Sequence, residues 1–175
     1  MRIAVCGLTG SGKSTLGEEL SRSLNIPHIS YTFKDLAKEK GISLMEFQKL
    51  AEKDLSIDKE FDLMVAKECK RKKDFIISTW LGGWYDQLFG IKFDLKVWVN
   101  IPDKINAERV SKRDGISLKE ASSHIQTRNE ENHMRYKSLY GINIYNQKGF
   151  DLFLDSGTNN PKQLVELVKK YLKLK

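Results

Sequence analysis

The residues best suited to chemistry form a glycine-rich run close to the start of the chain. They are Gly7, Leu8, Thr9, Gly10, Ser11, Gly12, Lys13, Ser14 and Thr15. In the pattern G-x-x-x-x-G-K-[ST], glycines let backbone N–H groups turn inward around phosphate oxygens, the lysine adds positive charge at the outer phosphates, and the hydroxyl binds Mg²⁺. Every part is present. The run therefore predicts a P-loop that binds a nucleoside triphosphate, with Lys13 as a catalytic group and Ser14 as the metal ligand.

A series of arginines follows in the later part of the chain: Arg109, Arg113, Arg128 and Arg135. The first two are four residues apart and the last two are seven apart, so each pair shares one face of a helix. Phosphoryl transfer needs such groups, because a positioned arginine can contribute about 10³ to 10⁵ in rate. The alternative is that these side chains only pair with neighbouring glutamates. We expect Arg113, Arg128 and Arg135 to be catalytic.

The P-loop alone leaves the reaction open, since GTPases, ATPases and small-molecule kinases all use one. A GTPase also needs a base-reading Asn-Lys-x-Asp sequence after a later strand. Here the apolar run 95–100 continues as Ile101-Pro102 instead. The sequence therefore disfavours a GTPase.

The pattern of apolar residues predicts the elements that must position these groups. Short apolar runs alternate with longer amphipathic ones, which is typical of strands joined by crossover helices in a parallel α/β sheet. We expect strands at 3–6, 28–30, 75–79, 95–100 and 150–154, and helices at 13–24, 32–40, 43–53, 56–73, 102–113, 117–140 and 161–172. Ligands bind beyond the carboxyl ends of such strands. The site should lie near Gly7, Tyr31, Ser78 and Asn100.

The bulk composition indicates one soluble domain over residues 1–175. Hydrophobic residues make up 40% and charged residues 30%, and no window approaches the roughly 18 apolar residues of a membrane span. The two cysteines, Cys6 and Cys69, lie in unlike contexts, so we expect reduced thiols and a cytoplasmic protein. The net charge of +7 comes mostly from segments 67–73 and 161–175. We interpret both as solvated helix ends, and nucleic acid as a possible but less favoured partner.

A family resemblance rests on several further segments. They are Phe33-Lys34-Asp35-Leu36-Ala37-Lys38-Glu39-Lys40-Gly41-Ile42-Ser43-Leu44, Ile57-Asp58 with Asp62, Leu81 with Gly83-Trp84, Arg109 with Lys112-Arg113, Arg128, and Arg135-Tyr136-Lys137-Ser138-Leu139-Tyr140-Gly141-Ile142-Asn143. Together with the P-loop they make the chain similar to the archaeal type of cytidylate kinase, a nucleoside monophosphate kinase of the adenylate kinase group.

The resemblance implies a three-layer α/β/α P-loop fold with a five-stranded parallel sheet. A helical insert at about 31–73 would bind the acceptor monophosphate, and a short lid at about 113–135 would bring in the arginines. Arg109 would then stack on the adenine of the donor ATP. The implied ligands are ATP with Mg²⁺ and CMP or dCMP, and the oligomeric state is not indicated.

The chain departs from the family at the acceptor side. The family pattern leads us to expect Phe-Arg at Phe33-Lys34 and Glu-Gly-Arg-Leu at 78–81, where this sequence has Ser-Thr-Trp-Leu. Lysine attracts phosphate but lacks the bidentate grip of arginine. The missing acid leaves Ser78, Thr79 or Asp35 as candidates to complete the magnesium shell. The candidate acceptor-binding residues are Tyr31, Lys34, Asp62 and Trp80.

Three hypotheses follow from these departures. The leading one is an ATP-dependent nucleoside monophosphate kinase. A second is a P-loop ATPase or nucleotide-binding factor with an altered acceptor site, acting on RNA or ribosomal partners. A third is a kinase for a nucleoside that carries no phosphate.

Trp80 either stacks an acceptor base or caps the sheet, whereas we expect Trp84 to pack in the core. The three histidines show no metal-ligand spacing.

Overall fold

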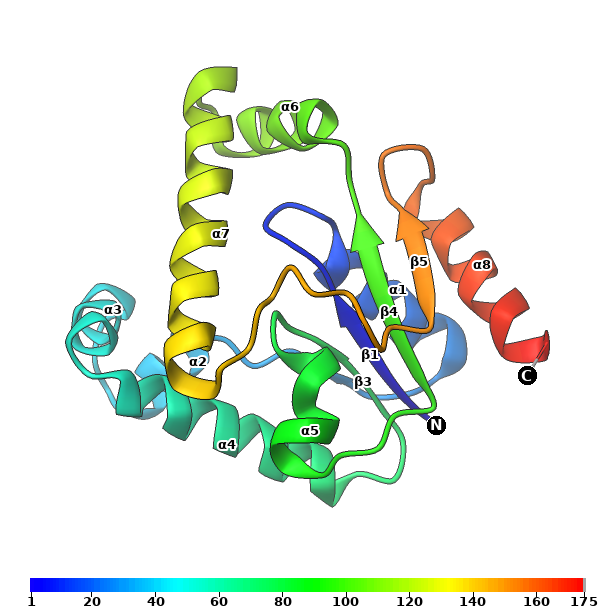
Figure 1. Ribbon diagram of the computed structural model, residues 1–175, viewed down its shortest axis with the longest axis horizontal. Coiled ribbons are helices and arrows are strands. Elements are labelled where there is room, and N and C mark those ends of the chain that lie inside the picture. Colours follow the sequence, from blue (N-terminus) through cyan, green and yellow to red (C-terminus); the bar gives the residue numbers. More distant parts are fainter. Residues whose placement is uncertain (175) are drawn as a thin grey trace.

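The architecture is a single parallel sheet between layers of helices (Figure 1). The computed structural model describes residues 1–174, without the side chains of residues 33, 34, 44, 45, 48, 49, 52 and 174. The strands are β1 (Arg2–Cys6), β2 (His28–Ile29), β3 (Phe75–Ser78), β4 (Leu95–Asn100) and β5 (Leu152–Asp155), in the spatial order β2-β3-β1-β4-β5. All neighbouring pairs are parallel. The predicted five-stranded parallel sheet is confirmed.

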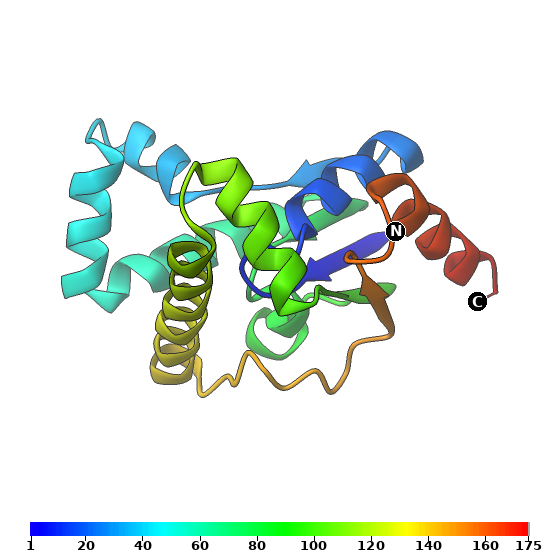
Figure 2. The ribbon, with the colours of Figure 1, turned by 90° about the horizontal axis from the view of Figure 1, so that it is seen from above.

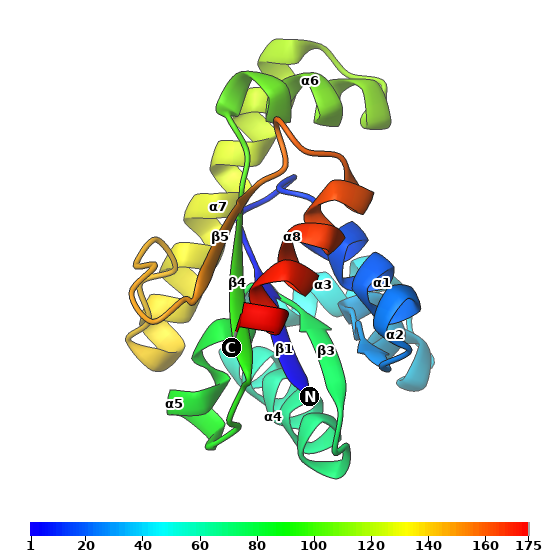
Figure 3. The same cartoon turned by 90° about the vertical axis from the view of Figure 1, so that its right-hand side faces the viewer.

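One face of the sheet is covered by α1 (Lys13–Leu24) and α8 (Pro161–Leu174), as Figure 3 shows. Alternate strand residues point to this face: Ile3 and Val5 of β1 pack in the same cluster as Leu16 and Leu20 of α1. The helix α1 begins after Gly12 and ends before its C-cap residue Asn25, whose φ of 54° is left-handed. Its bounds agree with the apolar periodicity of the sequence.

The opposite face is covered by α4 (Leu55–Arg71), a 3₁₀ turn η1 (Gly82–Trp84), α5 (Tyr85–Phe89) and the segment 141–150 (Figures 2 and 3). Ala4 and Cys6 of β1 point to this side. Trp84 is 5% exposed and makes edge-to-face contacts with Trp98 and Phe150. The predicted core role of Trp84 is confirmed, and the two covered faces give the predicted three-layer α/β/α fold.

Two helical pairs extend from the sheet. Helices α2 (Phe33–Glu39) and α3 (Leu44–Lys53) lie away from the sheet and share a small core with α4 (Figure 2). Helices α6 (Asp103–Asp114) and α7 (Leu118–Tyr140) form a hairpin past the carboxyl end of β4 (Figure 1). Capping boxes are present at Ser43/Glu46 and Ser117/Glu120. They fix where α3 and α7 begin, because each satisfies otherwise unpaired N–H groups.

The structure departs from the predicted elements in a few places. Two short elements, η1 and α5, were not predicted, β2 spans two residues rather than three, and the last strand begins at Leu152 rather than 150. None of the helices in the described part of the chain is long and apolar enough to cross a membrane.

Candidate active site

The P-loop joins the central strand to α1 in a conformation that depends on its glycines. Gly10 and Gly12 have φ of 78° and 86°, in the left-handed region that favours glycine. A Cβ on Gly7 would lie 2.5 Å from Ser11 Oγ and 2.6 Å from the Val99 carbonyl oxygen. The loop is therefore closely packed as well as tightly turned, and its backbone ends at the first turn of α1.

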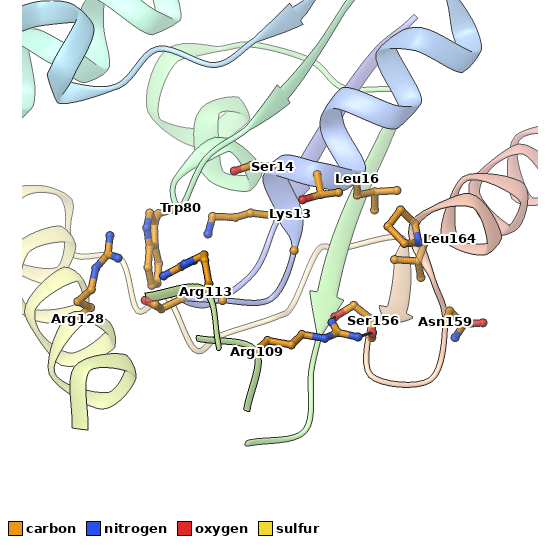
Figure 4. Close-up of a pocket in the computed structure, with 15 residues that line it drawn as sticks. Lys13, Ser14, Leu16, Trp80, Arg109, Arg113, Arg128, Ser156, Asn159 and Leu164 are labelled. Atoms are coloured by element: carbon orange, nitrogen blue, oxygen red, sulfur yellow. Dashed lines mark hydrogen bonds between the residues drawn. The ribbon is translucent and has the colours of Figure 1, made fainter. Parts of the chain in front are cut away.

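A cavity of about 400 Å³ opens over this loop (Figure 4). Its lining consists of P-loop and α1 residues together with side chains from the β3–η1 loop, α6, α7, the β5–α8 loop and the start of α8. These residues are Thr9, Gly10, Gly12, Lys13, Ser14, Thr15, Leu16, Trp80, Arg109, Arg113, Arg128, Ser156, Asn159, Pro161 and Leu164. Four of these residues are cationic, and none of the described lining residues is acidic. The charge of the cavity favours a polyanion.

Lys13 lies at the centre of this lining. Its Nζ donates to the Leu8 carbonyl oxygen at 3.4 Å and lies 4.9 Å from the centroid of the Trp80 ring. Burial, with a smaller contribution from Arg128, lowers the pKa of Lys13 to about 8. A bound phosphate would supply the negative charge that keeps this ammonium protonated.

One end of the cavity is formed by Arg109 and the loop after β5. The Arg109 guanidinium donates to the Ser156 carbonyl oxygen at 2.8 Å, and Ser156 Oγ donates to the Ser11 carbonyl oxygen at 2.8 Å. Asn159 and Leu164 line the same end. The structure thus brings Arg109 beside the P-loop, and its role in binding the donor stays a prediction.

The three arginines predicted to be catalytic occupy different surroundings. Arg128 and Arg113 line the cavity, and Figure 4 shows Arg128 on the far side of Trp80 from Lys13. Arg113 also forms a two-point pair with Asp114, at 2.6 and 2.7 Å. Arg135 is not among the described lining residues: its Nη1 lies 3.5 Å from Asp58 Oδ1 on α4.

Two buried carboxylates lie where α4 meets α7. Asp62 is 4% exposed, and its Oδ2 accepts a hydrogen bond from Tyr140 Oη at 3.0 Å. Burial, partly offset by hydrogen bonds from Tyr140 and Tyr85, raises the pKa of Asp62 to about 7. Burial also raises the pKa of Asp58, and Arg135 opposes that shift. Asp62 therefore holds a proton over much of the range in which an ordinary aspartate is ionised.

The other predicted acceptor residues are not all brought to the P-loop. Trp80 lines the cavity, but Tyr31 lines a different hollow of about 360 Å³ that also includes His28, Asp35 and Glu68. The side chain of Lys34 lies outside the described residues. Of the two described side chains, Trp80 and Tyr31, the structure places Trp80 beside Lys13.

The three residues considered for completing the magnesium shell have other hydrogen-bond partners. Ser78 Oγ lies 2.7 Å from His28 Nε2, and Thr79 Oγ1 accepts from the Gly82 N–H at 2.8 Å. Asp35 accepts from the Thr32 N–H in a capping box at the start of α2. Ser14 and Thr15 both line the cavity in the first turn of α1, and Ser14 is the one that the P-loop pattern assigns to the metal. Mg²⁺ commonly keeps several waters and binds through substrate phosphates, so this donor set fits an ion that arrives with the nucleotide.

Three polar residues that hold the P-loop were missed in the sequence. Asn106, Asn129 and Ser156 each bond to its backbone. Asn106 and Asn129 stand close in sequence to predicted arginines, but nothing in the spacing of single amides indicates a distant loop as their partner.

The P-loop follows the central strand of a parallel sheet with the order β2-β3-β1-β4-β5, and it faces a cavity lined by a lysine and three arginines. This fold and site define the class of P-loop phosphotransferases. The sequence profile of the Cytidylate kinase-like family matches residues 2–158. The chain belongs to this family, as the resemblance predicted.

Individual relatives agree with this placement. The chain is 40% identical over 172 residues to a cytidylate kinase of Pyrococcus abyssi, covering 95% of this chain and 91% of that protein. It is 38% identical over 169 residues to the cytidylate kinase of Pyrococcus horikoshii, covering 95% and 85%. Among solved structures, shikimate kinase from Aquifex aeolicus superimposes with a TM-score of 0.59 at 26% identity, covering 99% of this chain and 96% of that one.

Proposed function

We propose that this protein transfers the γ-phosphoryl group of ATP to a nucleoside monophosphate, with CMP and dCMP as the preferred acceptors. A phosphate oxygen of the acceptor attacks the γ-phosphorus, the bond from that phosphorus to the β,γ-bridging oxygen breaks, and ADP leaves. The observation that carries the proposal is the P-loop cavity lined by four cations in a chain of the cytidylate kinase-like family.

The donor half of the reaction is assigned to the P-loop and its surroundings. Backbone N–H groups of residues 7–15 and Lys13 would bind the β- and γ-phosphates, and Ser14 would bind the Mg²⁺ that neutralises part of their charge. Arg109 would lie against the adenine at the end of the cavity formed with Ser156. These assignments would put the transferred group beside Lys13, on the side of the cavity that Trp80 bounds.

The arginines are assigned to the transferring group. Arg128 and Arg113 already line the cavity, so their charge can stabilise the three equatorial oxygens of the transferred phosphoryl. Arg135 would reach phosphate only after leaving Asp58. Movement of a lid at about 113–135 would supply this rearrangement and exclude water, which suppresses ATP hydrolysis.

The acceptor is assigned to the side of the cavity bounded by Trp80. Tyr31, Lys34 and Asp62 belong to the insert at about 31–73, which would close toward the cavity when the monophosphate binds. Trp80 offers an aromatic surface in place of a guanidinium, so it can pack on the acceptor but cannot pair with its phosphate. We further propose a cytoplasmic setting, supported by two buried free cysteines.

The test is an assay of the purified protein with Mg-ATP and CMP, dCMP, UMP, AMP or GMP. We expect CDP and dCDP to form fastest. Lys13→Ala should lower kcat by about 10³-fold or more, because it removes the P-loop charge at the transferred phosphoryl. Lys170→Ala, an exposed lysine on α8, is the matched control and should leave the rate unchanged. Absence of product with all five acceptors would refute the proposal.

A further inference from the structure

The peptide groups on both sides of Thr9 are held by side chains from the two hairpin helices. The Thr9 N–H donates to Asn129 Oδ1 of α7 at 3.0 Å, and the Thr9 carbonyl oxygen accepts from Asn106 Nδ2 of α6 at 2.8 Å. Thr9 itself is 5% exposed. A single P-loop residue therefore connects to two helices that lie roughly 100 and 120 residues further along the chain.

The chemistry of these two bonds fixes which atom of each amide is used. A backbone N–H needs an acceptor and a carbonyl needs a donor, so Asn129 must present oxygen and Asn106 must present nitrogen. Asn106 is 3% exposed and stands beside the buried residues Ala107 and Val110. A buried amide group is costly unless it is hydrogen-bonded. The Nδ2 of Asn106 has that partner in the Thr9 carbonyl oxygen, whereas its buried Oδ1 has no hydrogen-bond partner among the described residues.

Asn106 also fits against the loop by shape. Its Oδ1 occupies the space that a Cβ on Gly10 would need, so the loop can approach α6 this closely only with glycine at that position. Gly10 has a φ of 78°, which separately favours glycine. Asn106 on α6 and Gly10 in the P-loop therefore both contribute to this close contact.

Each of the two amides stands next to a cation of the cavity. Asn129 directly follows Arg128, and Asn106 precedes Arg109 by three residues, about one helical turn. Figure 4 shows Arg128 and Arg109 on opposite sides of the P-loop lysine. A displacement of either amide from Thr9 would thus move the neighbouring guanidinium relative to the bound phosphates.

The two helices also pack on each other. Ala107 and Val110 of α6 share an apolar cluster with Ala121 and Ile125 of α7. The hairpin is therefore a unit, and the bonds to Thr9 tie that unit to the loop that binds phosphate.

We propose that Asn106 and Asn129 are positioning residues, which hold the α6–α7 hairpin against Thr9 and so set the distance of Arg109 and Arg128 from the nucleotide phosphates. The inference rests on the proposed use of ATP but not on which acceptor is phosphorylated. Neither amide would have a role in the donor site if it served only as a surface or core residue.

The first test is a double-mutant cycle on binding of an ATP analogue with an imido group between its β- and γ-phosphates, measured by calorimetry. Asn129→Ala and Arg128→Ala should each raise Kd by about fivefold to tenfold, the scale of one lost contact. The double variant should bind no more than about twofold worse than Arg128→Ala alone, because coupled residues are not additive. Multiplicative losses would overturn the proposal.

Gln126→Ala is the matched control for this cycle. Gln126 lies on α7 one turn before Asn129, and its amide bonds to Glu130 rather than to the P-loop. Its Kd for the analogue should equal that of the wild type. A loss as large as that of Asn129→Ala would mean that any change on this face of α7 disturbs the site, and would count against a specific role for Asn129.

The second test uses two isosteric changes that add the same charge. Asn129→Asp keeps an acceptor for the Thr9 N–H, whereas Asn106→Asp places a carboxylate against the Thr9 carbonyl oxygen, where a donor is needed. We expect Asn106→Asp to raise Kd at least about tenfold more than Asn129→Asp. Equal effects of the two changes on Kd would overturn the proposal. If Asn106→Asp does not fold, the double-mutant cycle at Asn129 and Arg128 still tests the proposal.

The analogue cannot transfer its γ-phosphoryl group, so neither test depends on an acceptor. A protein that binds the analogue as expected but phosphorylates no nucleoside monophosphate would refute the proposed function and leave the positioning role intact. The reverse outcome, active kinase with additive losses at Asn129 and Arg128, would refute only the positioning role.

Discussion

The buried carboxyl of Asp62 makes the stability of this protein depend on pH in a predictable direction. Burial raises its pKa from 3.8 in the unfolded chain to about 7 in the folded protein. Between these values the folded protein holds a proton that the unfolded chain has lost. The free energy of unfolding therefore falls as the pH rises through this window, and the dependence ends above about pH 7.

Asp62→Asn tests this reasoning because asparagine is nearly isosteric and carries no titrating proton. Its amide oxygen can still accept from Tyr140 Oη. From pH 5.5 to the folded pKa of about 7 is about 1.5 units, and each unit corresponds to roughly 1.4 kcal/mol. The stability of the variant relative to the wild type should improve by about 2 kcal/mol between pH 5.5 and pH 8.5.

The assay is urea denaturation of both proteins, followed by far-UV circular dichroism, at these two pH values. Other titrating groups largely cancel in the difference between variant and wild type. Asp103→Asn, at an exposed position at the start of α6, is the matched control and should give the same difference at both pH values. A pH-independent difference for Asp62→Asn would refute the assignment of a raised pKa to this carboxyl.

Two other predictions concern the cavity walls. Trp84 and Trp98 are 5% and 2% exposed, so Trp80 should account for any change of tryptophan emission on adding ATP, and Trp80→Phe should abolish it. A persisting change would show that the nucleotide perturbs the core instead. Ser156→Ala removes the donor to the buried Ser11 carbonyl, which should lower the free energy of unfolding by about 1 to 3 kcal/mol in urea. An unchanged midpoint would contradict this bond.

Much of the fold was predictable because several elements carry their own local signal. The helix Lys13–Leu24 has Leu16 and Leu20 on one face and a glycine-rich loop before it. The strand Leu95–Asn100 is a continuous apolar run, as expected for a strand covered on both faces. The capping box at Ser117 marks the start of the long helix α7. Each signal lies within a few residues of the element that it defines.

The short elements that follow β3 could not be predicted in the same way. η1 and α5 together span only residues 82–89, too few to show a helical period, and Trp84 and Tyr85 are buried because the sheet lies beneath them. Their helical form depends on tertiary packing rather than on local preference. Short helices are marginal in isolation for the same reason.

The candidate site likewise has one part that the sequence predicts and another part that it does not. The P-loop is contiguous, so its residues and their order predict its geometry, and Arg109, Arg113 and Arg128 reach the same cavity. The partner of Arg135 is Asp58, on another helix 77 positions earlier, and helix periodicity holds no information about that contact. The sequence indicates which face of a helix an arginine shares, but only the packed structure indicates what that face meets.

The cation-lined cavity has a consequence for how long the protein survives in a cell. Lys13, Arg109, Arg113 and Arg128 repel one another, so the fold carries an electrostatic cost that a bound polyanion removes. Nucleotide that binds only the folded state adds about 2.7 kcal/mol of stability at a concentration of 100 times Kd. With the proposed use of ATP, the unfolded fraction of the protein would therefore be roughly a hundredfold larger where nucleoside triphosphate is depleted, and so would the share of the protein that is open to proteases.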